Sequence, residues 1–334
     1  MNKMYNKEVK EAFLQYLIDE EGYTEETVHV FRFVFYKSYD VEDILQKDMY
    51  DFNTSELKQV LLNANKSTMN SVRAFASMMK KYIDWAIRTG LTNSNINPMD
   101  MFTTKDYEEC IDKSKKLFIS ESELISIENK LVNYQDKVVL RLAFEGINGY
   151  EVSEMLNLKK HDVDFKNKQL KLYDNKEGER FINVSERCIE IIEKAINEKI
   201  YYARNGDKTS AHGKSKYEYF ETDHVIKNVL AGRTTKRAAD KTVVYRRMNM
   251  IKEMFDMPYL TIKNVWRSGM IKMAVDLYKE EGELTNKQLA KIAEQFGLGK
   301  IINNGHETYN YHAMRQFINR ENILALYDID IEQK

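Results

Sequence analysis

The segment from residue 227 to residue 252 carries a local excess of positive charge that could bind phosphate groups. Its sequence, KNVLAGRTTKRAADKTVVYRRMNMIK, contains a single acid, Asp240. Against that acid stand eight cations, which are Lys227, Arg233, Lys236, Arg237, Lys241, Arg246, Arg247 and Lys252. Because the whole chain has a net charge of only −1, this excess predicts a contact with the backbone of a nucleic acid. The alternative interpretation is an ordinary solvated face.

A second group of candidate phosphate ligands gathers around the start of a predicted helix. The stretch KSTMNSVR offers short polar side chains at a helix N-terminus, where free backbone N–H groups favour anions. Its polar candidates are Ser67, Thr68 and Asn70, and the cations, two of them further along the helix, are Lys66, Arg73, Lys80 and Lys81. Residues of these types suit contact with phosphate or entry into a groove of duplex DNA.

The sequence lacks the residue patterns that are typical of metal sites and of nucleotide-binding sites. The six histidines include no HxxxH or HExxH pair, and the sequence has neither a P-loop nor a dinucleotide-binding fingerprint. The two cysteines, Cys110 and Cys188, have no CxxC spacing, so we expect them to be reduced packing residues. The sequence therefore predicts no metal site and no cofactor.

The composition limits the number of domains and the secondary-structure class of the fold that positions these residues. A chain of 334 residues, 43% hydrophobic and 31% charged, is long enough for two domains. With only 2 Pro and 13 Gly, the strongest helix breakers are scarce, so we expect a mainly helical protein. No apolar run approaches the ~20 residues that a bilayer requires, so we expect no membrane insertion and a cytoplasmic location.

Residues 1–105 are predicted to form a helical domain. Its most regular helix begins at a Ser67–Thr68 cap and ends at Gly90, with apolar residues recurring along one face. The stretch 27–39 is rich in β-branched and aromatic residues, so a strand is an alternative there to the helix that we favour. The polar segment 106–116 is predicted to be a linker.

Residues 117–334 are predicted to form a larger, mostly helical domain with one small β-sheet. The alternating runs KQLKLYD and ERFINVS, joined by NKEGE, indicate a β-hairpin with a glycine turn. We expect the sequence around it to be helical, including one continuous helix over residues 187–204.

The order of these elements and their local sequences resemble those of the tyrosine recombinases, or phage integrases, over nearly the whole chain. The stretch KSTMNSVRAFASMMKKYIDWAIRTGLTNSNINPMD is similar to the end of that family's core-binding domain. The stretches FISESEL and GYEVSEMLNLKKHDVDF are similar to the start of its catalytic domain and to its GLRxSELLxLxxxDID motif. The resemblance implies a mainly α fold with an N-terminal core-binding (SAM-like) domain, a larger C-terminal catalytic-like domain, and duplex DNA held between the two. The overall combination also resembles the recombinase-like repressors of SPbeta-type bacteriophages.

In this family a tyrosine attacks a DNA phosphodiester, while cations and hydrogen-bond donors stabilise the charge that develops. The resemblance places the six corresponding positions at Glu151 (first arginine), Lys176 (hairpin lysine), Asn264 (histidine), Arg267 (second arginine), Leu298 (donor) and Tyr311 (nucleophile). Tyr309 is the near alternative for the nucleophile, and Gly299, Lys300 or His306 could move into the donor position. An acid, an amide and an apolar side chain thus replace charge-stabilising groups.

Each of these residues also has a purely structural interpretation. Glu151 could be a solvated first-turn acid, favoured by the helix dipole, and Lys176 could be an ordinary turn lysine. Arg267 could form a structural ion pair, and Tyr311 could be a packed or surface tyrosine. At a vestigial arginine position, the carboxylate of Glu151 would instead repel a nearby phosphate.

We therefore interpret the chain as a catalytically inactive recombinase homologue that binds double-stranded DNA sequence-specifically, as a phage or prophage transcriptional repressor in a bacterial host. One alternative is an active recombinase with an unorthodox catalytic set. Another is an accessory protein that acts through self-association of the C-terminal segment NILALYDIDIEQK, which resembles the tail that recombinase subunits exchange. The sequence identifies no inducer, whether protein or peptide.

Overall fold

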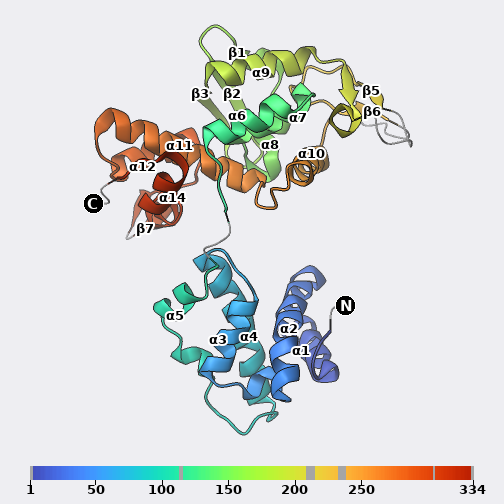
Figure 1. The fold of residues 1–334 in the computed structure, drawn as a ribbon, viewed down its shortest axis with the longest axis vertical. Coiled ribbons are helices and arrows are strands. Elements are labelled where there is room, and N and C mark those ends of the chain that lie inside the picture. The colour runs from blue at the N-terminus through green and yellow to red at the C-terminus, as the bar shows by residue number, and fades with distance from the viewer. Residues whose placement is uncertain (1–2, 113–115, 208–214, 232–237, 304, 332–334) are drawn as a thin grey trace. The chain divides into compact units, whose positions relative to one another are not determined.

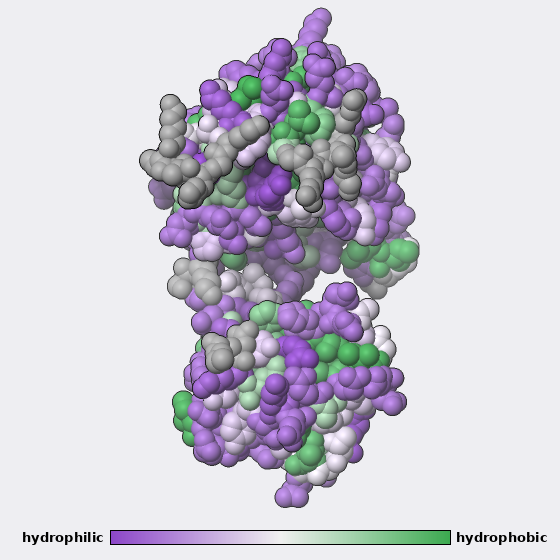
Figure 2. Space-filling view, turned by 90° about the vertical axis from the view of Figure 1, so that its right-hand side faces the viewer, coloured by the Kyte–Doolittle hydropathy of each residue, from purple (hydrophilic) through white to green (hydrophobic). Residues whose placement is uncertain are grey.

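A computed structural model describes residues 3–112, 116–207, 215–231, 238–303 and 305–331 (Figure 1). The chain forms two compact units, Met1–Lys116 and Leu117–Lys334. Helices dominate both units, which confirms the predicted mainly α class. Hydrophilic residues predominate on the face shown in Figure 2, and hydrophobic residues form small scattered patches there. Within the described ranges, no helix is long and apolar enough to cross a membrane.

The first unit is a bundle of helices joined by short turns (Figure 1). In chain order its elements are α1 (Lys7–Asp19), α2 (Glu25–Leu45), the 3-10 turn η1 (Met49–Asp51), α3 (Thr54–Asn63), α4 (Met69–Arg88), η2 (Pro98–Met101) and α5 (Thr104–Glu109). The stretch 27–39 is thus helical, as favoured. Thr68 caps α4, because its side-chain oxygen accepts the backbone N–H of Ser71.

The segment predicted as a linker, 106–116, belongs in part to this bundle. It includes most of α5 and the buried Cys110, and Ile111 forms a bridge to Lys66. Polar composition suggested a linker, but few apolar residues suffice to dock so short a helix on an existing core. Residues 106–112 of the predicted linker therefore pack on the first unit.

A buried charge network joins α1, α2, η1 and α4 inside the first unit. The Lys10 ammonium lies 2.6 Å from a carboxylate oxygen of Glu42 and 3.2 Å from one of Asp48. Tyr82 donates to Asp48 at 2.9 Å, and Ser38 donates to Glu42 at 2.8 Å. Since two carboxylates share one ammonium, the cluster carries an excess of negative charge when both are ionised. Burial, partly offset by Lys10, raises the pKa of Glu42 to about 7.

The second unit combines helices with three small antiparallel sheets among its described residues. Its helices are α6 (Glu121–Lys130), α7 (Tyr134–Phe144), α8 (Ser153–Asn157), α9 (Glu186–Asn197), α10 (Lys241–Met254), α11 (Ile262–Glu281), α12 (Asn286–Gln295), α13 (Tyr311–Arg315) and α14 (Arg320–Tyr327), with 3-10 turns η3 (Tyr150–Val152), η4 (Lys160–Asp162) and η5 (Ala203–Gly206). The sheets are β1 (Val163–Asp164), β2 (Gln169–Asp174) and β3 (Gly178–Asn183); β4 (Ile200–Tyr202), β5 (Lys216–Tyr219) and β6 (Val229–Leu230); and β7 (Ile301–Asn303) and β8 (His306–Thr308). The predicted hairpin is β2–β3, closed by the pair Asp174 and Gly178.

The prediction of a single helix over residues 187–204 was wrong for residues 198–204. Helix α9 ends at Asn197, and the following Ile-Tyr-Tyr run forms β4, in which Tyr201 pairs with Tyr217 of β5. Isoleucine and tyrosine favour strands where a partner strand is present, and β5 supplies it. A short apolar run alone does not distinguish the two structures.

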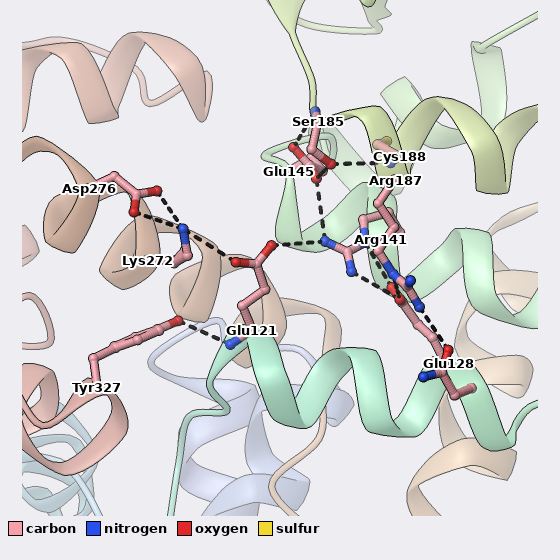
Figure 3. A network of polar contacts seen from close by, with 11 residues as sticks. Glu121, Glu128, Arg141, Glu145, Ser185, Arg187, Cys188, Lys272, Asp276 and Tyr327 are labelled. Carbon is pink, nitrogen blue, oxygen red and sulfur yellow. Dashed lines mark hydrogen bonds and ion pairs between the residues drawn. The ribbon is translucent and has the colours of Figure 1, made fainter.

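Helix α7 is the centre of the second unit, because it packs against α6, α9, α10 and α11. Its Arg141 is fully buried and donates to both carboxylate oxygens of Glu128, at 2.8 and 2.9 Å. Figure 3 shows how further ion pairs and hydrogen bonds extend this contact through residues of α6, α7, α9, α11 and α14. The buried pair thus ties together helices that are far apart in the sequence.

The pKa of Glu42 gives the first unit a specific dependence on pH. Because the folded-state pKa of about 7 lies above the ordinary value of 4.5, this group stabilises the fold fully below pH 4.5 and loses that contribution as the pH rises through 7. We expect Glu42→Gln to remove a decrease on the order of 1–3 kcal/mol in the free energy of unfolding across this window. Trp85 fluorescence in a Trp266→Phe background would report the unfolding of this unit.

The matched control is Asp43→Asn, an exposed acid on the same helix. Its pH profile should follow that of the unsubstituted protein. A Glu42→Gln profile that keeps the full slope between pH 4.5 and 7 would assign the effect to another group.

Candidate nucleic-acid interface

The turn that carries Glu151 has an unusual backbone. Both Glu151 and Val152 adopt left-handed conformations, with φ of 54° and 61°. For a β-branched residue such as Val152 this conformation is strained, at roughly 1–3 kcal/mol, and it persists only when neighbouring structure enforces it. The turn η3 therefore needs an external anchor.

Asp174, at the end of β2, is that anchor. Its carboxylate accepts the backbone N–H of Tyr150, the Ser153 hydroxyl at 2.7 Å, and the backbone N–H groups of Lys176 and Glu177 at 2.7 and 2.8 Å. Burial alone would raise the pKa of Asp174, but these hydrogen bonds outweigh it and lower the pKa to about 2. One ionised carboxylate thus joins η3 to the tip of the β2–β3 hairpin.

Arg180 of β3 joins the hairpin to two further elements. Its guanidinium donates to Glu154 of α8 at 2.5 and 2.9 Å, to the carbonyl of Gly146 at 2.9 Å, and to the carbonyl of Gln295 in α12 at 2.8 Å. Gly297, two residues after Gln295, also lies against Arg180, since a Cβ at this position would be 3.0 Å from the guanidinium. The hairpin, α8 and the end of α12 are therefore held by a single side chain.

Glu151 is neither buried nor alone. Its carboxylate binds the ammonium of Lys241, the first residue of α10, at 2.6 Å, and both side chains are 51% exposed. The ammonium of Lys176 lies 4.1 Å from the centre of the Tyr150 ring. Three elements, η3, the hairpin tip and α10, thus bring Glu151 together with two of the predicted phosphate-binding lysines.

The two candidates on α11 differ in how they are engaged. The amide of Asn264 donates to the carbonyl of Tyr259 at 2.9 Å, so this group has a structural role. The half-buried Arg267 lies over the ring of Phe317, 4.8 Å from its centre, and forms no ion pair within the described residues. Burial lowers the pKa of Arg267, and the pKa of nearby Lys263 is lowered chiefly by the charge of Arg267. These two cations therefore lack a neutralising acid in the part of the chain described.

Leu298 and the two candidate tyrosines surround one hydrophobic cluster that includes residues of α11 and α12. Leu298 packs partly buried against this cluster and offers no polar atom at the predicted donor position. Tyr311 starts α13, and the ring of Tyr309 meets it edge-on at 6.3 Å between centres. Burial raises the pKa of Tyr309, which makes its phenolate less accessible at neutral pH.

The structure divides the predicted basic segment. Arg246 and Lys241 are exposed, whereas Arg247 is only 4% exposed and donates to the carbonyls of Gln135 and Lys227 at 3.1 and 2.7 Å. Arg247 also lies 3.6 Å from Asp136, and the buried Lys227 ammonium donates to main-chain carbonyls of residues 196 and 198. Arg247 therefore does not lie on a phosphate-binding surface.

Helical spacing could have revealed this burial, because Arg247 falls between Val244 and Ile251 on the apolar face of α10. Of the other cations in this segment, Lys252 is half-buried. Arg233, Lys236 and Arg237 lie outside the described residues.

The candidates at the start of α4 are largely engaged within the first unit. Lys80 pairs with Asp84 and Asp100, and Lys81 pairs with Glu21 at 2.8 Å. The side chain of Arg73 donates to Thr104, and the Lys66 ammonium lies 5.1 Å from the centre of the Phe75 ring. Ser67 is half-buried and Asn70 exposed. Acids thus neutralise the two lysines, which makes them weaker phosphate ligands than predicted.

The C-terminal segment folds back on its own unit as far as residue 331. Ile323 of α14 is buried, and the Tyr327 hydroxyl accepts the backbone N–H of Glu121 at 3.2 Å. Among the described residues, no group of three His, Cys, Asp or Glu side chains could hold a metal ion.

Comparisons with known proteins agree with the element order. Residues 4–88 match a family model described as "MrpR, N-terminal core-binding domain", and residues 118–328 match "MrpR, C-terminal catalytic domain". The chain is 34% identical over 328 residues to the SPbeta prophage-derived uncharacterized protein YopR of Bacillus subtilis, covering 97% of each chain. It is 23% identical over 192 residues to the tyrosine recombinase XerC of Staphylococcus aureus, covering 55% of this chain and 62% of XerC. Lambda integrase bound to a COC' core site matches at 12% identity, covering 95% and 78% of the two chains, with a TM-score of 0.49.

The neighbouring arginines of α10 provide a direct test of the division between buried and exposed cations. Arg247→Ala should lower the free energy of unfolding by about 3–5 kcal/mol, because it leaves the buried Asp136 carboxylate, which keeps its hydrogen bond from Asn133, without a neutralising cation. Arg246→Ala should change it by less than about 0.5 kcal/mol. Denaturant unfolding followed by circular dichroism measures both values, and similar losses in the two variants would contradict the buried role of Arg247.

Proposed function

We propose, because the chain belongs to the MrpR family of core-binding and catalytic domains, that it binds double-stranded DNA sequence-specifically as a prophage transcriptional repressor. Its fold is that of a tyrosine recombinase, and it has a close relative encoded by the SPbeta prophage. The proposal is that this fold holds DNA without cutting it. An operator-bound protein of this kind acts by occupancy alone.

The observation that carries the DNA-binding part is the unneutralised pair of cations on α11. Arg267 and Lys263 lie one helical turn apart, and the positive charge of Arg267 is the main cause that lowers the pKa of Lys263. Neither forms an ion pair within the described ranges. Like charges at this spacing destabilise a helix unless an anion relieves the repulsion. A phosphodiester would do so, and arginine contacts to phosphate are the usual means of positioning a protein on DNA.

Three replacements support the absence of strand cleavage. Cleavage by a tyrosine requires cations around the phosphate and a donor for the departing oxygen. Here Glu151 stands at one cation position, the Asn264 amide is committed to Tyr259, and Leu298 has no proton to donate. Each loss of a preorganised charge-stabilising group costs on the order of 100-fold or more in rate.

An active recombinase with an unorthodox catalytic set is the second candidate. It is favoured by the presence of Lys176 and Arg267, together with the detectable similarity to XerC. The accessory role through an exchanged C-terminal tail has less support, because α14 packs on its own unit.

Arg267→Gln tests the DNA-binding proposal. Removing this cation should weaken binding to a labelled random-sequence duplex and flatten the log–log salt dependence by about one unit, since one phosphate contact is lost. Fluorescence anisotropy over a range of salt concentrations measures both quantities. Arg320→Gln is the matched control, because Asp330 already neutralises Arg320. Equal effects of the two substitutions, or no salt dependence in the unsubstituted protein, would count against the proposal.

Tyr311→Phe separates the repressor from the recombinase. If the tyrosine has no nucleophilic role, the variant should keep its DNA affinity within a factor of a few and should still repress a reporter in cells. On nicked suicide substrates, neither the variant nor the unsubstituted protein should form a covalent adduct on a denaturing gel. Tyr309→Phe should behave in the same way. An adduct that either substitution abolishes would establish the recombinase.

A further inference from the structure

We propose that Lys241 supplies the positive charge that is missing at position 151, and that Glu151 positions the Lys241 ammonium against a DNA phosphate. This inference rests on the proposed DNA-binding function and assigns a specific role to two residues of the second unit. It reverses the interpretation of Glu151 as a group that repels DNA.

The first support is the rigidity of the turn that presents Glu151. The strained η3 backbone is fixed by Asp174, which binds the N–H of Tyr150 on one side of Glu151 and the Ser153 hydroxyl on the other. A Cβ on Gly149 would lie 2.3 Å from the same carboxylate, so the backbone lies too close to Asp174 for any side chain at this position. The carboxylate of Glu151 therefore extends from a fixed point.

The second support is the geometry of the ion pair. Lys241 is the first residue of α10, and Asp240 caps that helix by accepting the N–H of Thr242 at 3.0 Å. The Lys241 ammonium lies 2.6 Å from Glu151 and remains 51% exposed. An ammonium has three N–H donors. The bond to Glu151 uses one of them, and among the residues that the structure describes no other group binds this ammonium, so two donors are left for an incoming phosphate.

The third support is the character of the surrounding surface, which we call the η3/α10 patch and define as Tyr150, Glu151, Lys176, Lys241 and Tyr245. The two tyrosines are 49% and 45% exposed, and both affect the pKa of Lys241, which is raised mainly by its bond to Glu151. Lysine ammoniums and tyrosine hydroxyls are common donors to DNA phosphates. With two cations and one acid, the patch keeps a net positive charge.

The Glu151–Lys241 pair itself adds little to folding, because exposed ion pairs contribute about 1 kcal/mol or less. The turn beneath it is nevertheless strained. A carboxylate at this place has a clear use if it restricts the long side chain of Lys241, because preorganising a flexible lysine lowers the entropy lost when it binds phosphate. The carboxylates of Asp174 and Asp240 lie near the patch but do not compete for the Lys241 ammonium. Asp174 accepts backbone N–H groups of the hairpin turn, and Asp240 accepts a backbone N–H of its own helix.

A double-substitution cycle with Glu151→Gln, Lys241→Gln and the double variant distinguishes positioning from repulsion. The affinity for a labelled random-sequence duplex and its salt dependence are measured for each protein. If Glu151 positions Lys241, Lys241→Gln weakens binding about three- to tenfold and flattens the salt slope by about one unit. Glu151→Gln then also weakens binding, by about twofold, but has no such effect when Lys241 is already replaced.

The opposite sign overturns the inference: if Glu151 repels DNA, Glu151→Gln tightens binding and the double variant recovers the original affinity. The matched control is Lys291→Gln, which breaks an ion pair of the same 2.6 Å length with Glu281 outside the patch and should leave the salt slope unchanged. Failure of the proposed function has a different signature, because the unsubstituted protein would then show no salt-dependent binding. If that protein binds and Arg267→Gln weakens it while Lys241→Gln has no effect, only the role of Lys241 is refuted.

Discussion

The second unit depends on the need to compensate one charge that has no access to water. Arg141 and Glu128 are both fully buried, and an unpaired charge at such a place would cost several kcal/mol. Residues of α6, α9, α11 and α14, or next to them, extend the polar network around the pair. Glu145 accepts from the Ser185 hydroxyl at the start of α9, and Glu121 links Arg141 to Lys272 of α11 and, through its backbone N–H, to Tyr327 of α14 (Figure 3). Helix α7 ends at Phe144 within this network, and the turn η3 begins a few residues later at Tyr150.

Under the proposed function, charge rather than architecture distinguishes this chain from an enzyme of the same fold. The hairpin, the α11 arginine and the terminal tyrosine helix are all in place, but the polar groups around them serve the structure. Asn264 holds a main-chain carbonyl, Arg180 is fully used within the protein, and Glu151 is bound to a lysine 90 residues away. A scaffold whose donors are committed internally can still present cations to a polyanion. Phosphoryl transfer requires concentrated, unshared charge, and the proposed absence of strand cleavage rests on this difference.

Sequence patterns predicted the features that depend on neighbours in the chain. The Thr68 cap, the helical identity of residues 27–39 and the hairpin around Gly178 follow from local propensity and spacing. Patterns did not predict features that depend on distant partners. The pairing of Glu151 with Lys241 arises only when α10 docks beside η3, and β4 becomes a strand only because β5 lies next to it. Counting charges also misplaced Arg247, since a sum over a segment ignores which face of a helix each residue occupies.

Arg180 forms a mechanical link between the β2–β3 hairpin, which carries Lys176 of the proposed DNA-binding patch, and helix α12. All three nitrogens of its guanidinium are used. Moving α8 away would leave the charge of Glu154 unpaired, and moving α12 away would leave one guanidinium nitrogen without its acceptors. An event that draws α12 outwards would therefore act on β3 of the hairpin through Arg180. Release of bound DNA would then require no competitor for the DNA surface. A molecule that bound near the end of α12 and loosened it would weaken a contact between the hairpin and DNA without touching the DNA-binding surface.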